Sequence, residues 1–152
     1  MIDVSPSPVS DSRTCDPTTV TQDELRDATY QQSDDVRNAL ALFSRRLLTA
    51  GLAHDTDKLL DLDWFHRCFQ TGMRDTSWWD NHRRINRHHL AQADGVPFDV
   101  DLLDVLEFIA DCVMAGLART GTVYRLELPD ELLQRAFQNT VTFLCFEVRV
   151  TP

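Results

Sequence analysis

Histidine and aspartate residues gather at two places in the sequence, and both residue types bind transition metals. The first place is the segment HDTDK at residues 54–58, in which His54 and Asp55 are adjacent, and the second lies at residues 82–89. Four of the five histidines belong to these two places: His54, His82, His88 and His89. Imidazole and carboxylate groups from separate segments are what Mn, Fe, Co and Zn sites use. The pattern therefore predicts a site for one or two divalent ions, with Mg as a further option.

A third group of candidate ligands lies downstream. Asp104, Glu107 and Asp111 are spaced i, i+3, i+7 and so share one face of a predicted helix whose other face is apolar. Burying like charges together is unfavourable unless a cation binds them. His82 and His89, two helical turns apart, would also share a face of one helix. A solvated surface explains each group taken singly, and His66 is assigned to that alternative, but their order and shared faces together favour a metal site.

Helices must position these residues, because apolar side chains recur at helical spacing along most of the chain. Thr21 and Glu24 form a capping-box pattern that opens a first helix, Ser33 is the expected N-cap of the second, and Asp99 caps a later one. The predicted helices cover about 22–31, 34–50, 54–60, 62–71, a long segment that begins at Asp75 or Thr76 and carries His82 to His89, 100–118, and 130–147.

These helices predict an all-α fold, a single-domain bundle of about six or seven helices over residues 21–152. Residues 1–20 are rich in Ser, Thr, Pro and Asp and are predicted to be a disordered arm. The segment 140–150 is β-branched and aromatic and could be a terminal strand. Helix is preferred there because the sequence offers no evident partner strand.

The net charge of −9 excludes some classes of partner. Duplex nucleic acid and anionic lipid both select for Lys and Arg, so neither is expected to bind. No apolar run is long enough to span a bilayer and the N-terminus lacks a secretory pattern, which predicts a cytoplasmic protein. No two cysteines are spaced as CxxC, so reduced thiols are expected.

The order of these motifs resembles the HD-domain phosphohydrolase superfamily, in which a helical bundle presents a histidine, a His-Asp pair and a later aspartate to metal. The string HDTDK resembles the HDxxK motif of the HD-GYP branch. The histidine pair at 88–89 and the aspartate of FIADCV, Asp111, resemble that branch's second histidine set and final aspartate. The resemblance implies a metal-dependent enzyme that hydrolyses phosphoesters.

Residues from about 34 to 142 are more closely similar to a family of small uncharacterised HD-like proteins, often encoded by bacteriophages. That family's pattern runs HDxSK, HxxxNxHH, LxDxxEMxxDW and an Asn-Thr pair. The corresponding strings here are HDTDK, HRRINRHH, LLDVLEFIADC and Asn139-Thr140. The closer family implies no biochemistry, so the expected chemistry comes from the broader superfamily.

Two departures from the superfamily pattern limit what the resemblance implies. Asn38 stands where the helix before the His-Asp pair usually carries a first histidine, and it is interpreted as a lost ligand position. Because asparagine is a weaker ligand than histidine, this change predicts one ion or a degenerate site. The GYP element is absent, so cyclic-dinucleotide hydrolysis is not carried over.

Resemblance and geometry together assign roles to individual residues. The predicted metal ligands are His54, Asp55, His82, His89 and Asp111, with His88 as the alternative to His89, and with Asp104 as a further ligand or an orienting group. Asp55 would bridge two ions or orient the attacking water, and Glu107 would orient ligands or join them. Lys58, the only lysine, lies one turn after His54 and could meet a substrate phosphate as a point charge.

Arg83 and Arg87 flank the histidines and could bind further phosphate oxygens. A solvated basic face is an equally good explanation of both. The expected function is a metal-dependent phosphohydrolase that acts on a small phosphorylated substrate such as a nucleotide. Two alternatives remain, a non-catalytic helical binding or regulatory module with a structural metal and a di-iron oxygenase. A homodimer is a further option. Trp78 and Trp79 could line a pocket or a dimer contact, although core packing is the more common fate of tryptophan.

Overall fold

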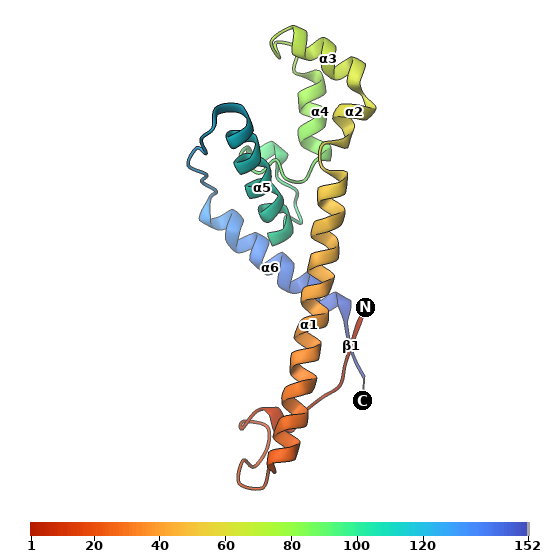
Figure 1. The fold of residues 1–152 in the computed structure, drawn as a ribbon, viewed down its shortest axis with the longest axis vertical. Coiled ribbons are helices and arrows are strands. Elements are labelled where there is room, and N and C mark those ends of the chain that lie inside the picture. The colour runs from red at the N-terminus through yellow and green to blue at the C-terminus, as the bar shows by residue number, and fades with distance from the viewer. Residues whose placement is uncertain (152) are drawn as a thin grey trace. The chain divides into compact units, whose positions relative to one another are not determined.

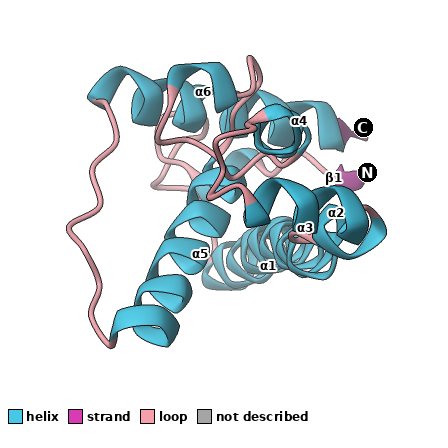
Figure 2. Cartoon of the chain, turned by 90° about the horizontal axis from the view of Figure 1, so that it is seen from above, coloured by secondary structure: helices cyan, strands magenta, loops and turns pink. Residues whose placement is uncertain are grey.

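The computed structural model describes residues 1–151, apart from the side chain of Ala93. Over that range most of the chain is helical and only two short strands are present, which confirms the all-α class (Figure 1). Figure 2 shows helices joined by loops, with short strands near the two termini. The α-helices are α1 (Gln22–Ala53), α2 (Thr56–Leu60), α3 (Leu62–Gln70), α4 (Ser77–Ile85), α5 (Leu102–Thr120) and α6 (Asp130–Glu147), and two 3-10 helices are η1 (Pro8–Ser10) and η2 (Ala93–Gly95). None of these helices is both long and apolar enough to cross a membrane.

The chain divides into two compact units, which we describe separately. The first unit contains residues 1–45 together with the segment from Val141 onward, and the second runs from Arg46 to Thr140. All the predicted site residues except Asn38 belong to the second unit. Asn38 lies in α1 within the first unit, so its interpretation as a lost ligand position stays a prediction.

The first unit contains a small parallel sheet that joins the two ends of the chain. Strand β1 (Ile2–Val4) pairs with β2 (Val148–Val150), in a register that matches Ile2 with Val148. Helix α6 ends at Glu147, as expected, but the preference for helix throughout 140–150 is wrong for its last three residues. Their partner strand lies at the other end of the sequence, where three residues in a polar segment carry no recognisable strand pattern.

Helix α1 begins as expected and then continues through two predicted boundaries. The Thr21 and Glu24 side chains each accept a hydrogen bond from the other residue's backbone N–H, which forms the predicted capping box. Ser33 is not an N-cap, because its hydroxyl donates to the Thr29 carbonyl at 2.8 Å and its backbone stays helical. Gly51 also lies inside the helix, so one helix of 32 residues replaces the two expected ones.

The second unit is organised around α5 and α6. Its apolar core contains residues of both helices and of the loop between α4 and α5: Leu90, Val100, Val105, Phe108, Leu132 and Ala136. Helix α5 is capped by Asp101 rather than Asp99. The Asp101 carboxylate accepts from the backbone N–H of Leu103 and Asp104, and the Asp104 side chain accepts from the Asp101 N–H. Gly121, with φ of 71°, ends α5 as expected.

Candidate metal centre

The His54-Asp55 pair lies in the tight connection between α1 and α2 rather than in a helix. Asp55 has φ of 54° and ψ of 18°, the left-handed conformation, which costs most residues energy but is tolerated by Asp and Asn. Helices α2, α3 and α4 then follow as a group of short helices in contact with one another (Figure 1). A non-glycine residue held in this conformation is typical of functional sites.

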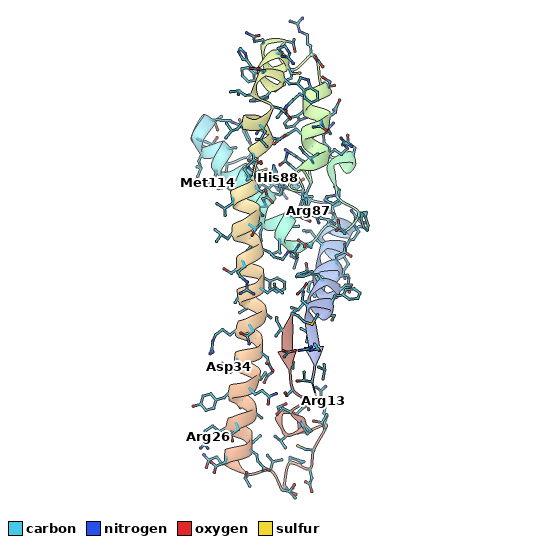
Figure 3. The ribbon with its side chains drawn as sticks, turned by 90° about the vertical axis from the view of Figure 1, so that its right-hand side faces the viewer. Arg13, Arg26, Asp34, Arg87, His88 and Met114 are labelled. Atoms are coloured by element: carbon cyan, nitrogen blue, oxygen red, sulfur yellow. The ribbon has the colours of Figure 1, made fainter. Side chains whose placement is uncertain are left out.

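Helix α4 ends at Ile85, and this early end changes how the histidines are presented. The Asn86 backbone is extended, and its side-chain amide donates to the His82 carbonyl at 3.0 Å. An Asn side chain that bonds the nearby backbone in this way favours a helix end. The expectation of one long helix carrying His82 to His89 is therefore wrong. His88 and His89 lie in the following loop, with ring centroids 6.4 and 4.7 Å from that of His82. Figure 3 labels His88 among the side chains of this region.

Four residues bring one potential ligand atom each to within 4.8 Å of the others: Asp55, His82, His88 and His89. Each of the four has a buried polar atom without a hydrogen-bond partner, namely Asp55 Oδ1 and the Nε2 atoms of the three histidines. Asp55 Oδ1 lies 3.3 Å from His82 Nε2 and 3.7 Å from His88 Nε2. In a tetrahedron with metal–ligand bonds of about 2.1 Å, neighbouring ligand atoms are about 3.4 Å apart. These spacings fit a metal ion.

Hydrogen bonds on the far side of two rings determine which nitrogen is free to bind metal. His82 Nδ1 lies 2.7 Å from Asp57 Oδ2, and His88 Nδ1 lies 3.0 Å from Glu107 Oε1. An ionised carboxylate only accepts, so each Nδ1 carries the hydrogen and each Nε2 of a neutral ring presents a lone pair. Both lone pairs face the Asp55 carboxylate. Lone pairs and an anionic oxygen repel one another unless a cation lies between them, which is the role that a metal would fill.

A second set of potential ligands adjoins the first and shares His88 with it: His54, His88 and Asp111. His54 Nδ1 lies 2.9 Å from Glu107 Oε1, the same oxygen that faces His88. His54 Nε2 lies 3.6 Å from Asp111 Oδ1 and also 3.6 Å from Asp55 Oδ2. Glu107 thus orients two histidines at once, and Asp55 offers one oxygen to each ligand set.

The charge states of these groups suit metal binding at neutral pH. Burial tends to raise the pKa of Asp55, but the Lys58 ammonium beside it and the nearby histidines outweigh burial and hold that pKa below its usual value. Burial lowers the pKa of His88, and burial together with the charges of His88 and His82 lowers the pKa of His89 to about 4. Asp55 is therefore ionised, while His88 and His89 are neutral, which is the form that binds metal.

Aromatic rings and one glycine fix the positions of the histidine rings. Trp78, which is fully buried, stacks on His82 with ring centroids 4.7 Å apart, and Trp79 meets His89 edge-on at 5.2 Å. Gly95 in η2 lies so close to the His89 carbonyl that a Cβ there would be 2.4 Å from the oxygen. Trp79, His89 and Asp111 also line a cavity of about 190 Å³, with Arg83, Gln92 and Phe108.

Three predicted site residues are engaged elsewhere. Asp104 accepts two hydrogen bonds from Arg87, at 2.7 and 2.8 Å, in addition to its part in the α5 capping box. Arg87 also donates to Asp99 at 3.0 Å, and Arg83 pairs with Asp80 and Asp94. The structure therefore does not bring Asp104 into either ligand set. Both arginines form ion pairs with carboxylates outside the two ligand sets.

Two residues of the site carried no predicted role. Asp57 lies inside the HDTDK segment, is buried, and accepts from His82 Nδ1. Asn86 donates from its side chain to Asp57 Oδ1 at 3.1 Å and so orients that carboxylate. The available signals were the position of Asp57 two residues after Asp55, and that of Asn86 one helical turn after His82.

No protein-family model, no curated protein sequence and no solved structure matches this chain. The cluster of histidines and carboxylates, which could hold a metal ion, is therefore the feature from which a function has to be argued.

Proposed function

We propose that the chain is a metal-dependent phosphohydrolase that acts on a nucleotide or a related phosphoester, with a centre like that of the HD-domain superfamily. One observation carries the proposal. Four buried ligand atoms without hydrogen-bond partners converge, and carboxylates hold the Nδ1 atoms of His82 and His88 on the opposite side of their rings. Buried polar groups are normally paired, so a convergent set of unpaired ligand atoms calls for a cation.

The residues that would hold the ion are Asp55, His82, His88 and His89. A divalent metal bound there would polarise a phosphoryl oxygen and lower the pKa of a water molecule. Asp57 and Glu107 keep the histidine rings in the binding tautomer and raise their basicity. Lys58, whose side chain is 28% exposed, lies beside Asp55 where its ammonium can meet an anionic substrate.

The cavity beside His89 and Asp111 would receive the organic part of the substrate. Its volume of about 190 Å³ is below the usual range for sites that enclose a drug-sized ligand. Trp79 and Phe108 supply aromatic surface, and Arg83 supplies a positive charge. The cavity therefore suits part of a nucleotide, or a small phosphoester, rather than a large polymeric substrate.

Metal content tests the proposal first. Protein purified without added metal and then dialysed against Mn, Co, Fe or Zn should carry bound ion by elemental analysis. Asp55→Asn keeps the side-chain size and the tolerance for the left-handed backbone but removes the charge. It should lose more affinity than the about 10–100-fold expected for a residue that only orients a ligand.

Turnover tests the proposal second. A panel of nucleotides and small phosphomonoesters and phosphodiesters, assayed with Mn or Co, should give phosphate or nucleoside release that the Asp55→Asn variant lacks. Absence of bound metal in the native protein would refute the whole proposal. Bound metal without turnover of any phosphoester would refute the catalytic part alone.

A second candidate is a metal-containing module without catalysis. The observation that favours it is that carboxylates hold both Arg83 and Arg87. Of the three predicted phosphate-binding side chains, Lys58 is then the one beside the cluster, where it contacts Asp55. Such a module would bind a phosphorylated ligand in calorimetry only when metal is present, and would not consume it.

A further inference from the structure

We infer that the centre binds one divalent ion rather than two, because Lys58 occupies the carboxylate oxygen that a second ion would need. The inference rests on the proposed metal-binding function and concerns the composition of that same site. It assigns Lys58 a role other than contact with substrate, as a fixed positive charge inside the ligand cluster.

The two oxygens of Asp55 are in different environments. Oδ1 is buried, has no hydrogen-bond partner, and faces the Nε2 atoms of His82 and His88. Oδ2 accepts a hydrogen bond from Lys58 Nζ and lies 3.6 Å from His54 Nε2. A carboxylate bridges two ions by giving one oxygen to each. Here the ammonium group holds the oxygen directed at the second ligand set.

The number of ligands available to a second ion leads to the same conclusion. The second set shares His88 with the first. With its Nδ1 hydrogen directed at Glu107, a neutral His88 has one lone pair and binds one ion. If His88 serves the first ion, the second retains only His54 and Asp111 of its set, unless Asp55 Oδ2 joins them. That third ligand is the oxygen that Lys58 holds.

Charge explains why the lysine can take this place. Four carboxylates take part in or adjoin the two ligand sets: Asp55, Asp57, Glu107 and Asp111. Lys58 and one divalent ion together bring three positive charges against these four carboxylates. A second divalent ion would have to bind beside the ammonium, where like charges repel at short range in a partly buried site.

The experiment counts ions per chain. Equilibrium dialysis against Mn followed by elemental analysis should give one ion for the native protein. Lys58→Met, which keeps the length and removes the charge, should give two, and a coupled Mn pair should appear in the electron paramagnetic resonance spectrum. Lys58→Arg is the matched control and should stay at one. Adding Asp111→Asn to Lys58→Met should return the count to one.

A second route uses the folded native protein, so that it does not depend on the folding of a variant. Lys58 is the only lysine, so acetylation neutralises this one side chain and the N-terminal amine. Acetylated native protein should bind a second ion. The Lys58→Arg protein, in which acetylation reaches only the N-terminus, should not.

The outcomes separate this inference from the proposed function. Two ions in native protein, or one ion in both acetylated native protein and folded Lys58→Met, would overturn the inference and leave the metal assignment intact. No bound ion in any form would overturn the proposed function itself. One ion in native protein and two after removal of the Lys58 charge, by either route, would support both.

Discussion

Glu107 connects the two ligand sets through a single oxygen. Its Oε1 faces His54 Nδ1 at 2.9 Å and His88 Nδ1 at 3.0 Å, and the two rings lie 4.4 Å apart. One carboxylate therefore fixes the tautomer of a histidine in each set. The sequence predicted Asp111 as a ligand and left Glu107 either to orient ligands or to join them. The structure places Asp111 in a ligand set and directs Glu107 at the Nδ1 atoms of two histidines.

Replacing Glu107 with Gln should weaken metal binding without removing a ligand. The amide keeps the size of the side chain but loses the charge that makes both Nδ1–H groups good partners, so affinity should fall by about 10–100-fold. Competition with a coloured chelator measures the change. Glu131→Gln, the same substitution at an exposed position of α6, is the control and should leave affinity unchanged. Equal affinities for the two variants would contradict the role of Glu107.

The lowered histidine pKa values predict how the stability of metal-free protein depends on pH. The folded pKa of His89 is about 4, below the value of about 6.5 for an unfolded chain. Between these values the unfolded chain binds more protons, so the free energy of unfolding should decrease as pH falls from 6.5 toward 4. Burial lowers the pKa of His88 too, which adds to the same trend.

The size of this trend should be about 1–2 kcal/mol after allowance for solvent screening. Urea titrations of metal-free protein at pH 7, 5.5 and 4.5 measure it. His89→Gln removes one titrating group and should flatten the dependence. A variant with the native slope would show that His89 does not carry the effect.

At the scale of elements, the residue at which α4 ends determines where His88 and His89 lie. The capping-box pattern predicted the start of α1, and helical periodicity with turn signals predicted the extents of α3, α5 and α6 within one or two residues. Periodicity could not predict that α4 stops at Ile85, because the cause is the Asn86 side chain bonding to His82 and Asp57. One is a helix-capping contact and the other a tertiary contact, and neither changes the spacing of apolar residues in the sequence. His88, which the sequence offered only as the alternative to His89, is the residue that the two ligand sets share.

The same limit applies to the residues that the sequence assigned to the site. All five first-choice ligands fall in the two ligand sets: His54, Asp55, His82, His89 and Asp111. Residue type and motif order alone had suggested them. Asp104 belongs to neither set. Its spacing on α5 suggested a ligand, but its carboxylate accepts hydrogen bonds from Arg87 and from the Asp101 backbone N–H at the start of α5. The N-cap of α5 is Asp101, two residues later than the expected Asp99, and the Asp104 side chain completes the capping box there.

Gly95→Ala should disturb the site from η2. Its added Cβ would lie 2.4 Å from the His89 carbonyl oxygen, so the loop backbone would have to move and carry His89 with it. We expect a loss of about 1–3 kcal/mol in stability and weaker metal binding. Gly51→Ala is the matched control, because nothing lies within 4 Å of its Cβ and alanine favours helix. It should stabilise the protein by about 0.5–1 kcal/mol and leave affinity unchanged, as thermal unfolding and chelator competition can show.

At the scale of the whole molecule, the potential metal ligands and their hydrogen-bond partners belong to one compact unit. Both ligand sets, with Asp57, Lys58 and Glu107, come from residues 46–140. The terminal sheet belongs to the other unit. The sequence predicted a single bundle preceded by a disordered arm and did not predict these two units. The first unit rests on contacts between the two ends of the chain, which are distant in sequence.

Deletion of residues 1–5 should therefore leave metal affinity within about twofold of the native value, which is about 0.4 kcal/mol. It removes β1 and with it the partner of β2, so amide protons at Val148–Val150 should exchange faster with solvent. Hydrogen exchange and chelator competition measure the two effects on one sample. A large fall in affinity would show that the centre depends on the terminal sheet.

The pairing of β1 with β2 also bears on the order in which the chain folds. Ile2 and Val148 are neighbours in the sheet although 146 positions separate them in sequence, whereas helices form from contacts only four residues apart. Closing so long a loop has a high entropic cost for three residue pairs of sheet, so the strands should join only after the helices have formed. The two chain ends should then be the last part of the protein to become protected during refolding and among the first to be released on unfolding.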